Sequence, residues 1–282
     1  MVAKKVLITD IDNTLFDWFT MWYQSFDAMI RKVSEISNIP LEVLYPEIKK
    51  IHQKYGTAEY AFLLEELKPL LKLYNEKNKL IQELRPAIEA YRNERNKNMV
   101  LYPDVLETLI TIKNMGLDII AFSESKKYYS SFRIERLGLD GIINTVYCPE
   151  DHQIPGGLTS SELLKKTECR VLNGDFKKPD PKILLQILSN SGLQPEEAIY
   201  VGDSKSKDIK MAIDANIDFL WFEFGSSHLS AKQKEYELLR KVTHWSDAEV
   251  EAEKNLALDG KKLNIPDSKI IQRYSDILDH IQ

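Results

Sequence analysis

Short apolar stretches alternate with helix-forming stretches along much of the chain, and this alternation constrains the fold more than any other feature. The first expected strand, residues 5–9, is rich in β-branched residues and continuous in its apolar character, which suits a central parallel strand covered on both faces. Strands are expected at residues 5–9, 117–122, 142–147, 198–201 and 217–222, and helices at residues 104–115, 126–137, 181–191 and 207–215. The alternation predicts an α/β fold, a doubly wound parallel sheet with right-handed crossovers.

A block of helix-forming sequence interrupts this alternation after the first expected strand. Helical spacing of apolar residues runs through residues 18–36, 41–55, 60–73 and 75–95, with prolines between and within these stretches. We therefore expect a core of residues 1–16 and 100–225 with an inserted helical domain at residues 17–99. The charged residues 226–282 are expected to form a C-terminal helical extension, with helices near 230–242 and 266–281, and we assign them no chemical role.

Composition and charge exclude several classes of protein. Of the 282 residues, 43% are hydrophobic and 29% are charged, and the formal net charge is −5. These values favour a compact fold and give no general attraction to nucleic acid or anionic lipid. No stretch reaches the roughly 18 uncharged residues of a transmembrane helix, and two cysteines are too few for a disulfide framework. We expect a cytoplasmic protein that binds neither nucleic acid nor membranes, and its oligomeric state stays open.

Carboxylates follow two of the expected strands. Asp10 and Asp12 come after the first strand, and Asp203 and Asp208 follow the strand that ends at residue 201. In a doubly wound sheet, ligands bind outside the carboxyl ends of the strands, so these side chains are candidates for a site. Close carboxylates repel one another, and Mg²⁺, which prefers oxygen ligands, is a common way to stabilise them. Aspartates at such places can also be turn residues or helix caps.

Two further places offer groups that could bind an anion. Ser123 follows the second expected strand, where its hydroxyl and the N–H groups of a helix start could hold an anion. The same serine could instead cap the following helix. Lys178 lies in a proline-containing turn ahead of a helix and offers a cation, and its neighbour Lys177 is an alternative. The sequence therefore predicts a local site for an anion.

Together these motifs resemble those of the haloacid dehalogenase superfamily of phosphohydrolases. The resemblance is carried by Asp-x-Asp-x-Thr at residues 10–14, Ser123, Lys-Pro-x-Pro at residues 178–181 and Gly-Asp-x-x-x-x-Asp at residues 202–208. The four motifs stand in the family's order and cover the expected core. The resemblance implies a Rossmann-like catalytic core, and the helical insertion stands where the family places a type C1 cap.

The resemblance also implies a reaction, the Mg²⁺-dependent hydrolysis of a small phosphorylated metabolite. Asp10 would attack phosphorus to form an aspartyl phosphate. Asp12 would act as general acid and then as general base. A dehalogenase of this superfamily lacks an acidic residue at the position of Asp12, so phosphatase activity is favoured.

The ligands implied by the resemblance come from the same motifs. Mg²⁺ would be held by the Asp10 carboxylate, the main-chain carbonyl of Asp12 and Asp203. Asp208 would be an additional ligand or would support the others. Ser123 and Lys178 would hold the non-bridging oxygens of the phosphate.

Two other functions stay open from the sequence. A phosphotransferase or phosphomutase would use the same aspartyl phosphate. A non-catalytic phosphate-binding or partner-binding module would keep the core without turnover, with the C-terminal extension as a surface for interaction. The physiological substrate also stays open between nucleotides, sugar phosphates and other esters.

Overall fold

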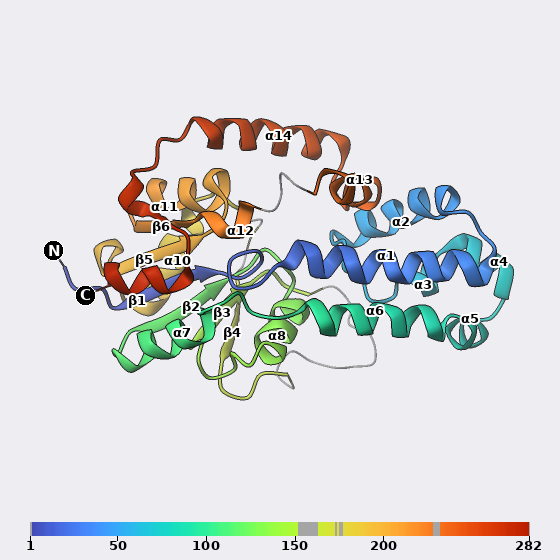
Figure 1. The fold of residues 1–282 in the computed structure, drawn as a ribbon, viewed down its shortest axis with the longest axis horizontal. Helices are drawn as coiled ribbons and strands as arrows, with labels where there is room; N and C mark the ends of the chain where they lie inside the picture. The colour runs from blue at the N-terminus through green and yellow to red at the C-terminus, as the bar shows by residue number, and fades with distance from the viewer. Residues whose placement is uncertain (1, 152–162, 173, 175–176, 228–231, 282) are drawn as a thin grey trace. The chain divides into compact units, whose positions relative to one another are not determined.

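The structure is a computed structural model that describes residues 2–151, 163–172, 174, 177–227 and 232–281. The chain forms two compact units (Figure 1). We call them the sheet unit, made of Met1–Asp17, Leu101–Leu229 and Glu253–Gln282, and the helical unit, made of Trp18–Val100 and Ser230–Ala252. The last 57 residues, expected as one extension, are therefore divided between the two units.

Within the described residues, a seven-stranded parallel sheet forms the centre of the sheet unit (Figure 1). Its strands are β1 (Val6–Asp10), β2 (Asp118–Phe122), β3 (Thr145–Cys148), β4 (Glu168–Val171), β5 (Ala198–Gly202), β6 (Asp218–Phe222) and β7 (Ile270–Ile271). Their spatial order is β4-β3-β2-β1-β5-β6-β7, and every neighbouring pair is parallel. The chain builds outward from β1 in both directions, which confirms the predicted doubly wound sheet and places its topological switch point between β1 and β5.

Helices pack against both faces of this sheet. They are α7 (Val105–Asn114), α8 (Lys127–Arg136), α10 (Lys182–Ser191), α11 (Lys210–Asp214) and α12 (Glu223–Ser227). The apolar side chains of α10 and α11 pack against Val6 and Ile8 of β1. The next residue of β1, Thr9, points to the opposite face and contacts Tyr274. That face also receives α7, which packs against β2 and the C-terminal segment.

The strands that the sequence did not predict lie at the two edges of the sheet. β4 has four residues, two of which are charged, and β7 has only two residues, so neither shows the longer apolar run of the central strands. The helix expected near residues 266–281 is wrong, since β7 lies there between two 3₁₀ turns, Asp267–Lys269 and Tyr274–His280. A helix that was not expected, α14 (Asp247–Lys262), precedes this segment.

The helical unit consists of the insertion and one helix from the C-terminal part. Its helices are α1 (Trp18–Ser37), α2 (Leu41–Tyr55), α3 (Leu63–Glu66), α4 (Lys68–Tyr74), α5 (Lys77–Glu83), α6 (Arg85–Asn98) and α13 (Gln233–Val242). Two expected stretches each divide into two helices, because Pro69 and Pro86 lie in the first turns of α4 and α6. Among the described helices, none is long and apolar enough to cross a membrane.

Aromatic residues form much of the core of the helical unit. Trp22 stacks on Phe26 with ring centroids 5.1 Å apart, and its indole N–H donates to the carbonyl of Ala58 at 3.0 Å. Phe19 stacks on Tyr236 of α13 at 4.2 Å. Because α13 contributes a ring to this core, the insertion and residues 233–242 pack as one body.

A buried histidine makes the stability of the helical unit depend on pH. His52 in α2 is fully buried, and its Nδ1–H donates to the carbonyl of Val242 in α13 at 2.6 Å. Burial lowers the pKa of His52 from 6.5 to about 4, although the carbonyl acts in the opposite direction. The unfolded chain therefore takes up a proton that the folded protein rejects. Between pH 6.5 and pH 4, falling pH should remove about 3 kcal/mol of the free energy of unfolding.

Urea unfolding of the wild type and of His52→Gln between pH 7 and pH 4 measures this effect. Glutamine does not titrate, so the wild type should be the more stable protein at pH 7 and should lose that advantage as the pH falls. A difference between the two proteins that does not change with pH would contradict the assignment.

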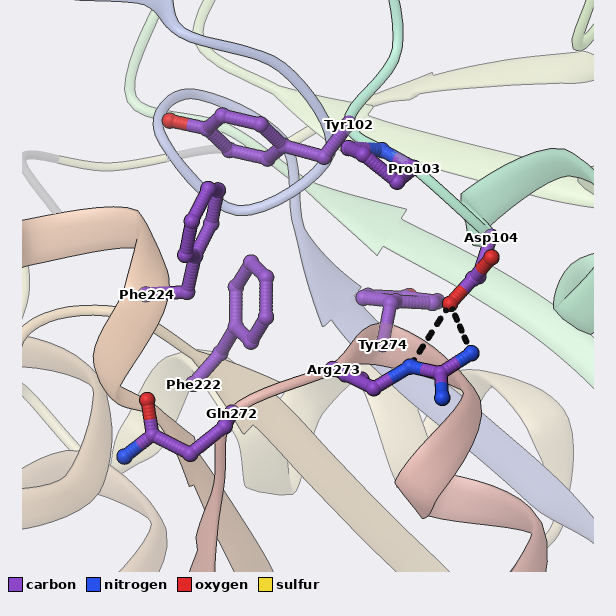
Figure 2. Close-up of a pocket in the computed structure, with 8 residues that line it drawn as sticks. All are labelled: Tyr102, Pro103, Asp104, Phe222, Phe224, Gln272, Arg273 and Tyr274. Atoms are coloured by element: carbon purple, nitrogen blue, oxygen red, sulfur yellow. Dashed lines mark hydrogen bonds and ion pairs between the residues drawn. The ribbon is translucent and has the colours of Figure 1, made fainter.

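The C-terminal segment lines a pocket in the sheet unit (Figure 2). The pocket is lined by Tyr102, Pro103, Asp104, Phe222, Phe224, Gln272, Arg273 and Tyr274. Tyr102 meets Phe224 edge-on at 5.2 Å, and the Arg273 guanidinium donates to the Asp104 carboxylate at 2.8 and 3.0 Å. Since β7 also extends the sheet, this segment is an integral part of the sheet unit.

Candidate active site

The register of the sheet brings three of the predicted residues to the carboxyl ends of its central strands. Asp10 ends β1 and lies opposite Phe122, so Ser123 follows directly at the carboxyl end of β2. On the other side of β1, Thr9 lies opposite Val201, which places Asp203 just beyond the end of β5. The site therefore lies at the switch point of the sheet, where α/β proteins bind their ligands.

Three buried carboxylates lie close together at the carboxyl ends of these strands. Asp10, Asp203 and Asp208 each offer an oxygen within 4.8 Å of the others, and all three are buried. The ammonium of Lys178 forms ion pairs with Asp10 and with Asp208, at 2.6 Å from Asp208 Oδ1. The Thr14 hydroxyl lies 3.1 Å from Asp10 Oδ2 and 3.3 Å from Asp203 Oδ1, so it can donate to either. The structure thus groups three of the predicted metal ligands around the predicted phosphate-binding lysine.

The negative charges in this group outnumber the positive one. Burial raises the pKa of Asp10 well above its usual value, and the charges of Asp208 and Asp203 add to the effect while Lys178 opposes it. Burial and the charge of Asp208 raise the pKa of Asp203 to about 7. For Lys178, burial lowers the pKa, but Asp10 and Asp208 outweigh it and raise that pKa well above its usual value. One ammonium cannot neutralise three carboxylates, and a bound divalent cation would supply the missing charge.

A π-helical turn directs the Asp208 side chain back toward the end of β5. The turn spans Lys205–Ile209, and the N–H groups of Asp208 and Ile209 both donate to the carbonyl of Ser204. The Asp208 carboxylate accepts from the Tyr200 hydroxyl at 2.7 Å and from the Ser204 N–H at 3.0 Å. A Cβ on Gly202 would lie 2.4 Å from Asp208 Cγ, so the side chain can approach only because residue 202 is glycine.

The Asp12 carboxylate has different partners from the three grouped carboxylates. Its Oδ2 accepts from the hydroxyls of Ser123 and Ser125 at 2.9 and 3.0 Å and from Arg133 Nη1 at 3.1 Å. Ser123 is fully buried, and Arg133 is only 1% exposed. The predicted acid and base therefore contacts the predicted phosphate-binding serine directly.

The sequence left open whether Lys177 or Lys178 binds the anion. Lys178 is the one that lies beside the three aspartates. It is buried, whereas Lys177 is exposed. The backbone N–H of Lys178 donates to Glu124 Oε1 at 3.0 Å, and its ammonium lies 5.1 Å from the centre of the Phe122 ring. These contacts tie the loop before α10 to the end of β2 and direct the ammonium inward.

The C-terminal part also holds the end of β1. The Tyr274 hydroxyl lies 3.0 Å from Thr9 Oγ1, and the Thr9 hydroxyl donates to the main-chain carbonyl of Asp10 at 2.9 Å. A Cβ on Gly260 of α14 would lie 2.7 Å from Ser206 Cβ, so α14 approaches the π-helical turn very closely. Tyr274 and Gly260 thus contact the end of β1, which carries Asp10, and the π-helical turn, which carries Asp208.

β6 and the helix that follows it, α12, both contact Asp203. The indole N–H of Trp221 donates to the main-chain carbonyl of Asp203 at 2.7 Å. A Cβ on Gly225 would lie 2.8 Å from Asp203 Cβ and 2.1 Å from the carbonyl oxygen of Asn13. Glycine at position 225 therefore lets α12 pack directly on the two loops of the site.

Sequence reasoning missed several of these supporting residues. Arg133 carried a usable signal, because it occupies the buried face of α8 together with Ser130 and Ile134, where a charged residue is unusual. Tyr274 carried none, because its contact with Thr9 depends on the packing of the C-terminal segment.

Comparison with known proteins gives one family match and several relatives. Residues 4–216 match the model of the family described as haloacid dehalogenase-like hydrolase. The glyceraldehyde 3-phosphate phosphatase of Methanopyrus kandleri is 25% identical over 214 residues, covering 74% of this chain and 79% of that protein. The phosphoglycolate phosphatase of Aquifex aeolicus is 24% identical over 204 residues, covering 71% and 76%.

Solved structures share the fold. The 2-haloacid dehalogenase of Pseudomonas syringae superposes with a TM-score of 0.51 at 18% identity, covering 78% of this chain and 86% of that one. A protein of Haemophilus somnus described as a predicted phosphoglycolate phosphatase superposes with a TM-score of 0.50 at 17% identity over the full length of both chains.

The family match spans all four motifs of the sequence, from Asp10 to Asp208. It confirms the predicted superfamily, and the phosphatase names of the relatives support the predicted phosphatase. The chain belongs to the haloacid dehalogenase-like hydrolase family.

Proposed function

We propose that this protein is a Mg²⁺-dependent phosphomonoesterase that hydrolyses a small phosphorylated metabolite through an aspartyl phosphate on Asp10. The observation that carries the proposal is the buried group of Asp10, Asp203 and Asp208 around Lys178 at the switch point of the sheet. The relatives support the substrate class, because both are named for phosphate esters of small organic compounds.

The proposed reaction has two displacements at phosphorus. In the first, an oxygen of Asp10 bonds to phosphorus, the bond to the leaving oxygen breaks, and Asp12 gives that oxygen a proton. In the second, water attacks phosphorus, Asp12 takes a proton from the water, and the bond to Asp10 breaks. The phosphate is released and Asp10 is restored.

Ser123 and Lys178 would hold the non-bridging oxygens during both displacements. The Ser123 hydroxyl donates to Asp12, and the Lys178 ammonium pairs with Asp10 and Asp208. Both groups therefore already contact the two proposed catalytic aspartates. A phosphate between them would take over the Ser123 hydroxyl and share the Lys178 charge.

The donor set fits Mg²⁺, because three buried carboxylates with oxygen atoms within 4.8 Å of one another suit a hard divalent cation. We propose that Asp10, Asp203 and Asp208 hold it together with the main-chain carbonyl of Asp12. When bound, Mg²⁺ supplies positive charge that lets the anionic phosphate and the Asp10 carboxylate approach.

We further propose that the helical insertion, residues 17–99, is a cap of the C1 type that excludes bulk water and selects the leaving group. It has an aromatic core of its own, to which α13 contributes Tyr236. The proposed cap therefore includes residues 230–252, which the sequence had placed in the C-terminal extension.

Phosphate release from a panel of sugar phosphates, short phosphorylated acids and aldehydes, nucleoside monophosphates and an aryl phosphate tests the proposal. Release should stop with excess EDTA and return with Mg²⁺. Release that ignores chelation would overturn the metal assignment. Transfer of labelled phosphate to an acceptor alcohol in place of water would identify a phosphotransferase, and silence across the panel by the folded protein would favour a non-catalytic module.

A further inference from the structure

A buried arginine pairs with the proposed general acid, Asp12. The Arg133 side chain is 1% exposed, and Nη1 lies 3.1 Å from each carboxylate oxygen of Asp12. The guanidinium carbon lies 5.9 Å from the centre of the Phe16 ring. Burying a guanidinium is strongly unfavourable unless it is paired with an anion and hydrogen-bonded. The contact with Asp12 therefore helps to stabilise a charge on the buried face of α8.

We propose that Arg133 is a positioning residue that holds Asp12 beside the phosphate subsite and stabilises its carboxylate as the proton leaves. The inference rests on the proposed function and goes beyond it, because Arg133 lies outside all four motifs. Asp12 thus pairs with a buried cation other than Lys178, which Asp10 and Asp208 share.

The three donors to Asp12 differ in what they can do during the reaction. The hydroxyls of Ser123 and Ser125 are neutral, and Ser123 is also the proposed phosphate ligand. Once Ser123 donates to a phosphate oxygen, Asp12 keeps Ser125 and Arg133. In the substrate complex, Arg133 is therefore the charged partner that Asp12 retains, and it holds the carboxylate in place.

The proposed effect belongs to the step in which the leaving group departs. The electron pair of the breaking phosphorus–oxygen bond goes to the leaving oxygen, and the proton of Asp12 follows it. Asp12 is then a carboxylate 3.1 Å from a cation in a buried site, where the attraction is stronger than in water. Arg133 should therefore matter most for leaving groups that need the proton.

Substitution of Arg133 by methionine separates this role from a structural one. An alkyl phosphate such as glycerol 3-phosphate needs protonation of its leaving alcohol, whereas p-nitrophenyl phosphate releases a stable phenolate. Arg133→Met should lower kcat/KM about 100-fold for the alkyl ester and only about threefold for the aryl ester. Arg133→Lys, which keeps the charge, should recover most of the alkyl activity.

The matched control is Arg136→Met, which removes the same charge from an exposed position of the same helix and should leave both rates unchanged. Equal losses on both esters in a folded Arg133→Met protein would overturn the inference and leave Arg133 a structural role. If methionine prevents folding, Arg133→Gln, which keeps a neutral donor, takes its place with the same expected ratio.

A separate readout keeps the inference distinct from the proposed function. If the folded wild type releases phosphate from no member of the panel described above, the proposed phosphatase fails, and the crystal structure of Arg133→Met decides the positioning role. An Asp12 carboxylate displaced from Ser123 in that structure supports it. An Asp12 carboxylate still hydrogen-bonded to Ser123 and Ser125 overturns it.

Discussion

Replacement of Asp10 by asparagine is expected to abolish phosphate release and leave the protein folded. The amide keeps the shape of the side chain but is no nucleophile, so the rate should fall by about 10⁴-fold or more. Stability should be maintained, because burial and the charges of Asp208 and Asp203 already disfavour the ionised carboxyl, as its raised pKa shows. Initial rates of phosphate release and thermal unfolding measure the two effects.

Asp214→Asn is the matched control for this variant. Asp214 is exposed on α11 and pairs with Lys210 at the surface, where ion pairs contribute little. The control should keep the wild-type rate. Retention of more than a few per cent of that rate by Asp10→Asn would show that Asp10 is not the nucleophile.

Replacement of Lys178 by methionine is expected to reduce both activity and stability. Methionine fills similar space without charge, so Asp10 and Asp208 lose the ammonium that both contact. Breaking a buried ion pair from one side costs about 3 kcal/mol, and removing a cation that stabilises the transferring phosphate should lower kcat/KM at least about 100-fold. Urea unfolding without divalent cations and steady-state kinetics with Mg²⁺ give the two values.

Two further variants make the Lys178 experiment specific. Lys177→Met removes the same charge from an exposed neighbour and should change the free energy of unfolding by less than about 0.5 kcal/mol. The double variant Asp10→Asn with Lys178→Met should regain part of the lost stability, because one of the two facing carboxylates is gone. If Lys177→Met loses activity and Lys178→Met keeps it, the phosphate ligand is Lys177.

The central strands could be predicted because each is a short, mostly apolar run between helix-forming stretches. Asp10, Ser123 and Asp203 could be predicted as neighbours for the same reason, since each comes at the carboxyl end of a strand and a parallel sheet brings these ends together. The edge strands β4 and β7 escaped prediction because they are too short to show a pattern of their own, and their place in the sheet comes from pairing with β3 and β6.

The C-terminal part shows why local pattern was insufficient. Residues 266–281 have a helix-forming composition, yet Ile270 and Ile271 pair with β6 and Tyr274 contacts Thr9. These contacts join residues far apart in the sequence, and the packing they provide outweighs local helix propensity. The same packing makes α14 approach the π-helical turn at Ser206.

The sequence by itself determined the reactive groups and their order at the ends of strands. It also determined the α/β class, because apolar periodicity is a local property of the chain. Only the tertiary structure decided how the charges are shared, with Lys178 between Asp10 and Asp208, and with Arg133 on Asp12. Those pairings depend on which face of α8 is buried and on how the loop before α10 is held. Arg133 and Asp12, like Lys178 and Asp10, are more than 100 positions apart and meet only when the sheet and its helices pack.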